Sequence, residues 1–149
     1  MLRRRFHPLL SAAVALGLAV ALAPGSRAAA DDYKVIVNPE NPAPAIDRGF
    51  LREIYLRKAT DWPGLGPIRP LDLAKRFAVR ERFAHEVLKK TGAQLKVYWN
   101  QQIFSGKGVP PPEADSTAAA VAYVLANPGA IAYLPADADP GKAKVIRVQ

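Results

Sequence analysis

The fold of this chain is decided by residues 54–83, which read IYLRKATDWPGLGPIRPLDLAKRFAVRERF. A helical pattern ends ahead of the proline- and glycine-rich turn around Trp62. Ile68–Leu73 then alternates apolar and polar residues, which predicts a short strand. Pro70 indicates an edge position or irregular pairing for that strand, because proline cannot donate to a central ladder. The pattern that follows predicts a second helix over Ala78–Thr91.

The step from this strand into the second helix is a candidate anion site. A helix start presents unpaired backbone N–H groups and the positive end of the helix dipole. Basic side chains surround this one and can add charge-assisted hydrogen bonds. The alternative is an ordinary helix start with solvated basic side chains. The candidate ligand-binding residues are Lys75, Arg76, Phe77, Ala78, Val79 and Arg80.

The other segments alternate between strand and helix patterns. Gly92 is expected to end the Ala78–Thr91 helix, and Asp47 and either Asp115 or Ser116 are expected to cap helix starts. Alternation of this kind predicts an α/β fold, a small mixed sheet flanked by about four helices. The further predicted strands are Tyr33–Val37, Ala130–Leu134 and Lys144–Val148, and the further helices begin near Asp47, span Ala93–Phe104 and run from about Ser116 to Ala126.

Apolar residues at helical spacing predict which faces are buried. In chain order, these faces hold Leu51, Ile54 and Tyr55; Val79, Phe83, Val87 and Leu88; and Val121, Val124 and Leu125. Leu95, Trp99 and Ile103 recur at four-residue steps in the Ala93–Phe104 helix.

Residues 1–30 have the pattern of a secretory signal. Arg3–Arg5 form a basic start, Leu9–Ala23 an apolar run, and Ala28 and Ala30 fit the small-residue cleavage rule. An uncleaved membrane anchor is the alternative, but the run is shorter than the ~20 residues that span a bilayer. We therefore expect a periplasmic protein whose single domain covers residues 31–149.

Composition limits the classes of partner that this domain is expected to bind. Residues 31–149 hold 17 basic and 13 acidic residues, a mild excess of positive charge. Such an excess suits an anionic small molecule or an acidic surface and does not indicate a nucleic-acid partner. The chain has no cysteine, which excludes disulfides and thiol chemistry.

No arrangement of residues predicts catalysis, a cofactor or a metal. Zinc spacing, a dinucleotide fingerprint and a nucleophile elbow are all missing from the sequence. His85 has no nucleophile to activate, and Asp137 and Asp139 fit a turn better than a calcium site. Ser105–Pro112 has the composition of a loop. The sequence therefore predicts a non-catalytic protein.

Five segments in order resemble the phosphate-type substrate-binding proteins of ABC transporters, above all their short, single-lobe members. Together the matches cover most of residues 33–136. They are VIVNPENP at 35–42, FLREIYLRKATDWPGLGPIRPLDL at 50–73, VRERF at 79–83, LKVYWNQQIFSGKGVPPP at 95–112 and NPGAIAYLP at 127–135.

The resemblance implies one lobe of a two-lobed type II periplasmic-binding-protein fold that holds phosphate or another small oxyanion between its lobes. The family's Ser-Gly-Thr run falls on Phe77, Ala78 and Val79, and its arginine falls near Leu73, so the hydroxyl ligands and that arginine are replaced here. A transporter, another periplasmic protein or a homodimer partner would complete the cleft. The alternative is a protein–protein interaction module on a degenerate lobe, with an exposed apolar face. Trp62 and Trp99 are most simply core or cleft-wall aromatics, and Trp62 is one possible member of that face.

Overall fold

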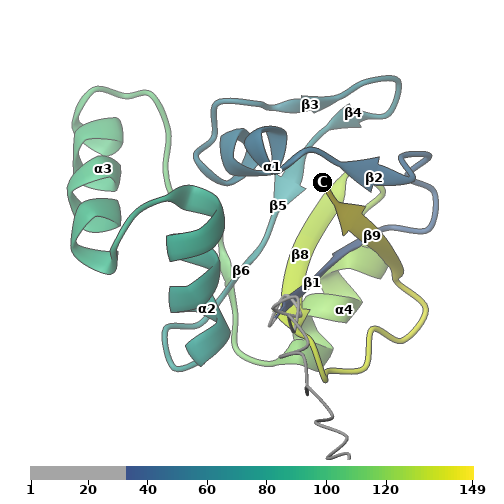
Figure 1. Cartoon of the computed structure of the whole chain (residues 1–149). Helices are drawn as coiled ribbons and strands as arrows, with labels where there is room; N and C mark the ends of the chain where they lie inside the picture. The colour runs from purple at the N-terminus through teal and green to yellow at the C-terminus, as the bar shows by residue number, and fades with distance from the viewer. Residues whose placement is uncertain (1–32) are drawn as a thin grey trace, which may run out of the picture.

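The computed structural model describes residues 33–149, so the predicted signal segment lies outside the described residues (Figure 1). The central sheet has the strand order β2-β9-β1-β8-β5. β1 is antiparallel to both of its neighbours, whereas β2 and β5 are parallel to theirs. This mixed sheet confirms the predicted α/β class. Its strands are β1 (Tyr33–Val37), β2 (Ala45–Ile46), β5 (Arg69–Pro70), β8 (Ala130–Pro135) and β9 (Lys144–Val148).

Four α-helices surround the sheet in the described part of the chain, and α2 continues directly into a π-helical turn, η1. Two further two-stranded ladders pair β3 with β4 and β6 with β7. The helices are α1 (Arg48–Tyr55), α2 (Ala78–Phe83), η1 (Ala84–Leu88), α3 (Gly92–Phe104) and α4 (Thr117–Ala126), and the short strands are β3 (Asp61–Trp62), β4 (Gly66–Pro67), β6 (Asp72–Leu73) and β7 (Glu113–Ala114).

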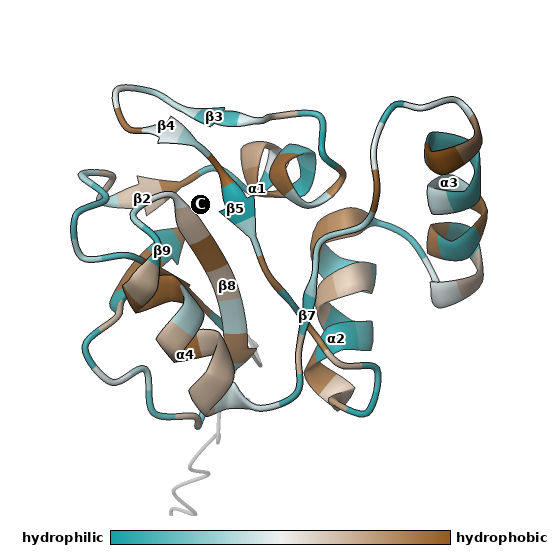
Figure 2. Cartoon of the chain, turned by 180° about the vertical axis from the view of Figure 1, so that it is seen from behind, coloured by the Kyte–Doolittle hydropathy of each residue, from teal (hydrophilic) through white to brown (hydrophobic). Residues whose placement is uncertain are grey.

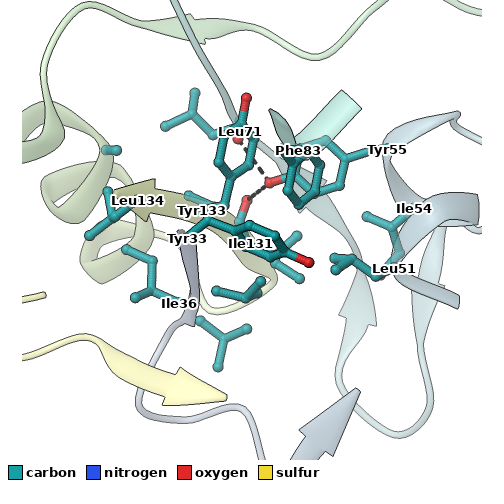
Figure 3. Close-up of a cluster of buried hydrophobic side chains, with 14 of the residues drawn as sticks. Tyr33, Ile36, Leu51, Ile54, Tyr55, Leu71, Phe83, Ile131, Tyr133 and Leu134 are labelled. Atoms are coloured by element: carbon teal, nitrogen blue, oxygen red, sulfur yellow. Dashed lines mark hydrogen bonds between the residues drawn. The ribbon is translucent and has the colours of Figure 1, made fainter. Parts of the chain in front are cut away.

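Helices cover both faces of the sheet. On one face, the ring of Tyr133 stacks on Phe83 with centroids 3.9 Å apart and meets Tyr55 of α1 edge-on at 5.7 Å (Figure 3). The buried hydroxyl of Tyr55 donates to the carbonyl oxygen of Leu71 at 3.0 Å, so this polar group has a hydrogen-bond partner inside the core. On the other face, α4 packs against β8 and β1. Within the described residues, the buried side chains of both faces belong to one hydrophobic core cluster.

Three predicted helix features are confirmed. The Asp47 carboxylate accepts a hydrogen bond from the Phe50 N–H at 3.0 Å and caps α1. Ser116, rather than Asp115, caps α4 by accepting from the Ala119 N–H at 3.0 Å. The predicted faces of α1 and of α2 with η1 are buried, and these comprise Leu51, Ile54, Tyr55, Val79, Phe83, Val87 and Leu88.

The prediction for Gly92 was wrong, because Gly92 begins α3 instead of ending the helix before it. η1 ends three residues earlier, at Lys89, whose left-handed φ of 56° breaks the helix. The Thr91 hydroxyl then accepts from the Gln94 N–H, while the Gln94 side chain accepts from the Thr91 N–H. This reciprocal capping box is a stronger start signal than the glycine is a stop signal.

The single strand predicted over Ile68–Leu73 is two strands in two different sheets. β5 pairs with β8 at the edge of the central sheet, which confirms the edge position that Pro70 predicted. β6 pairs with β7 instead. The chain changes partner around Leu71, whose N–H donates to the Ile131 carbonyl oxygen at 2.9 Å.

The burial prediction for the last helix was wrong, whereas Trp62 is a core aromatic, as its simplest reading predicted. α4 buries Ala120 and Val124, whereas Val121 is only partly buried and Leu125 is 38% exposed. Trp62 is 6% exposed and donates its indole N–H to a backbone carbonyl, so it cannot belong to an exposed interaction face. None of the described helices has both the length and the apolar character needed to cross a bilayer.

Candidate functional site

The start of α2, the candidate anion site, has no side-chain cap in the part of the chain that the structure describes. The chain leaves the buried strand β6 and makes a turn in which the Phe77 N–H donates to the Ala74 carbonyl at 3.0 Å. Phe77 is the N-cap residue in an extended conformation, and no side chain of the described residues caps this helix start. The first amides of α2 therefore keep the donor capacity that a side-chain cap would use.

The predicted site residues do not converge on one point. Val79 is buried in the core and Ala78 is exposed, so only the backbone of these two faces a ligand. Arg76 is exposed, reaches Asp115 at 3.3 Å and lies over the Phe77 ring at 5.1 Å. Lys75 is exposed and lines the hollow described below.

Arg80 points away from the helix start into a network of its own. One guanidinium nitrogen, Nη1, contacts the Glu113 carboxylate at 2.6 Å and donates to the Leu73 carbonyl at 2.7 Å. The other, Nη2, lies 3.2 Å from the Asp72 carboxylate. Two carboxylates thus already neutralise the side chain that was expected to supply charge to an anion.

Asp72 joins this network to the core. Its carboxylate accepts a hydrogen bond from the hydroxyl of Tyr133, a residue of β8 in the central sheet. Burial raises the pKa of Asp72, and the Tyr133 hydrogen bond and the Arg80 charge oppose that rise only in part. Burial, followed by the negative charge of Asp72, raises the pKa of Tyr133, which keeps its hydroxyl a donor.

Sequence reasoning missed this network. The alternation in residues 68–73 places Asp72 on the face opposite its apolar neighbours, which was the one available signal. Glu113 gave none, because it follows three prolines and lies in β7, a two-residue strand without β-branched residues. Only the pairing of β6 with β7 brings the two acids to one arginine.

A hollow of about 510 Å³ lies beside the network, bounded by α2 with η1, by α3 and by the prolines that precede β7. Its wall carries as many cations as acids, so it offers no net charge to an anion. The charged lining residues are Lys75, Arg80, Lys96, Asp72, Glu81 and Glu113, and the others are Tyr55, Ala84, Leu88, Gly92, Leu95, Trp99, Pro110 and Pro111.

α3 forms the outer wall of the hollow and has no buried residue. It stands at the edge of the molecule, apart from the sheet (Figure 1). Leu95 and Trp99 of the predicted stripe are half-buried, whereas Ile103 is 50% exposed. The hydroxyl of Tyr98 donates to the Leu56 carbonyl at 2.7 Å and ties the helix to the body.

Comparison with known proteins finds its matches among solved structures. No family model and no curated protein matches this sequence. A structure from Clostridium perfringens, described as a candidate phosphate ABC transporter substrate-binding protein with bound phosphate, is 20% identical with a TM-score of 0.61. An ABC-type phosphate transport receptor from Vibrio cholerae is 18% identical with a TM-score of 0.62, and PstS from Borrelia burgdorferi is 13% identical with a TM-score of 0.58.

These matches cover 78% of this chain but only 44%, 46% and 47% of the three neighbours, respectively. The chain thus spans about half the length of each. At such low sequence identity, the similarity is evidence for a shared backbone fold and not for a shared ligand. The chain has the fold of about half of a phosphate-type substrate-binding protein.

Proposed function

We propose that this chain is a non-catalytic, periplasmic binding lobe that contacts a small oxyanion such as phosphate at the start of α2, in connection with ABC-type transport. The observation that carries the proposal is the uncapped start of α2, on a fold shared with a phosphate-bound neighbour. The backbone amides of Ala78 and Val79 supply the hydrogen bonds. The Lys75 and Arg76 side chains supply positive charge.

The same geometry sets the strength of binding. Arg80 is already paired with Asp72 and Glu113, and the hydroxyl-bearing run of the resembling family is Phe77, Ala78 and Val79 here. One lobe also leaves half of the ligand in water. We therefore expect a dissociation constant of about 1 mM, some −4 kcal/mol, for this chain by itself.

Titration of a chain covering residues 31–149 tests the proposal. Amide shifts of Ala78 and Val79 in two-dimensional NMR, followed against phosphate, sulfate and chloride at constant ionic strength, should saturate with phosphate but not with chloride. Lys75→Ala should weaken the effect, whereas Lys142→Ala, an exposed lysine outside the site, should leave it unchanged. Equal shifts with all three anions would refute the proposal.

A further inference from the structure

One segment of the fold contributes little to the core. Residues 89–112, which we call the basic arm, comprise α3, the residues that join it to η1, and the loop that leads to β7. No residue of α3 is buried, although the helix is 13 residues long, and Leu95 and Tyr98 pack against the core while remaining partly exposed. The outward surface of the helix is free, and an exposed surface that is partly apolar is a candidate binding face.

The free surface of the basic arm is apolar at its protruding end. Phe104 is 92% exposed, Val109 60%, Val97 56% and Ile103 50%. The inward side of α3 holds Leu95, Tyr98, Trp99 and Gln102, which are only partly exposed. Apolar residues therefore occupy both sides of this helix, and hydrophobic bands run along it at the edge of the molecule (Figure 2).

The basic arm also carries the net charge of the domain. It contains Lys89, Lys90, Lys96 and Lys107 and no acidic residue. The remainder of residues 31–149 holds 13 basic and 13 acidic residues and is neutral. A cationic segment beside exposed apolar side chains is the combination that binds an anionic lipid surface, where lysines meet the headgroups and apolar tips enter the interface.

The turn between Phe104 and Val109, and the charge beside it, favour a bilayer over a second copy of this chain as the partner. Gly106 and Gly108 take positive φ values of 68° and 153° and turn the chain between Phe104 and Val109. Apart from the chain neighbours, no atom lies within 4 Å of a Cβ built on either glycine, so no described residue packs on that side of the turn. A second copy would bring four more lysines against these four, whereas an anionic bilayer surface has the opposite charge.

We propose that the basic arm docks this protein onto membranes rich in anionic phospholipid, with Phe104 and Val109 entering the interface and Lys107 contacting headgroups. The docking surface is distinct from the start of α2. It is independent of oxyanion binding, so either proposal can fail while the other stands.

Vesicle flotation of the chain covering residues 31–149 tests this proposal. At about 0.1 M salt, we expect binding to vesicles with about 30% phosphatidylglycerol and none to pure phosphatidylcholine, and a loss of binding at about 0.5 M salt. Binding that ignores lipid charge, or no binding at all, would overturn the proposal.

Matched variants locate the contact. Lys107→Glu should lower binding about tenfold or more, whereas Lys142→Glu, with the same change of net charge outside the basic arm, should change it by less than about twofold. Phe104→Ser should also lower binding at least about fivefold, whereas Val145→Ser, at a 51% exposed site on β9, should not. If both members of a pair behave alike, the basic arm is not the docking surface.

A tryptophan placed at the protruding end of the basic arm by Phe104→Trp, in a Trp99→Phe background, provides a direct readout, because the other tryptophan, Trp62, is buried in the body. Brominated lipids should quench the emission of this variant when it is bound, and should not quench that of Trp99→Phe alone. Light scattering without vesicles completes the test. If the protein forms a dimer that Phe104→Ser breaks, the basic arm binds a second copy of this chain and the membrane proposal is wrong.

Discussion

The indole N–H of Trp62 donates a 2.9 Å hydrogen bond to the carbonyl oxygen of Gly129, 67 residues further along the chain. The same oxygen accepts from the Arg69 N–H at 2.9 Å, so Gly129 joins the β3–β4 hairpin to the edge strand β5. A Cβ at Gly129 would lie only 2.0 Å from the Pro67 carbonyl oxygen, which is backbone and cannot rotate away.

Gly129→Ala is therefore expected to destabilise the fold by about 1–3 kcal/mol, because the backbone of the hairpin must move. Gly92→Ala is the matched control, since nothing lies within 4 Å of a Cβ there and alanine is the better residue in a helix. Urea unfolding measures both variants. Equal effects of the two substitutions would show that the contact at Gly129 does not constrain the hairpin.

Asp72 predicts a pH dependence. Its pKa is raised above the ordinary value of 3.8, chiefly by burial. A carboxyl group whose pKa is raised by folding adds stability below pH 3.8 and loses that contribution as the pH rises through the folded-state pKa. Wild type should therefore lose stability relative to Asp72→Asn between about pH 4 and the raised pKa. Parallel urea curves of the two proteins across that range check this sign, and the opposite trend would contradict it.

Glu113 competes with any anion for Arg80, because its carboxylate lies 2.6 Å from Nη1. Glu113→Gln removes that negative charge from the wall of the hollow. The affinity for phosphate should then rise about threefold to tenfold, equivalent to roughly 0.7–1.4 kcal/mol.

Glu40→Gln is the control for this measurement, because it changes net charge equally at an exposed loop position outside the hollow. Isothermal titration calorimetry with phosphate at constant ionic strength compares the two variants. An unchanged affinity in Glu113→Gln would place the bound anion away from Arg80.

Tyr98→Phe should loosen α3 without unfolding the body. The Tyr98 hydroxyl donates to the Leu56 carbonyl at 2.7 Å, and α3 has no buried residue to hold it otherwise. Hydrogen exchange should quicken in residues 92–104, while global stability falls by about 1 kcal/mol or less. Tyr123→Phe on α4 serves as the comparison, and faster exchange in α3 of that variant too would exclude a local cause.

The regular elements could be predicted from the sequence because their signals are local. Tyr33–Val37 is a β-branched run, and Asp47 and Ser116 are strong caps, so these elements could be located without knowing how the rest of the chain folds. Gly92 shows the limit of local signals, since the capping box of Thr91 and Gln94 reverses the meaning of the glycine between them.

The candidate site could be predicted only in part, because it depends on strands that are distant in sequence. The helix start at Ala78 was predicted by local pattern, and the structure places it there. The partners of Arg80 were not predicted. Glu113 comes close to Arg80 only because β6 pairs with β7, and these strands are about 40 residues apart in the chain. The core position of Trp62 was the simplest reading of the sequence, but the acceptor of its indole N–H was not predicted, because Gly129 follows α4, 67 residues later in the chain.

β1, the first strand of the described residues, lies in the sheet between β8 and β9, the last two strands in the chain. A nascent chain therefore has no partner for its first strand until residues 130–148 have been synthesised. Assembly of the central sheet must therefore wait for residues 130–148, and pairing across so many residues slows folding.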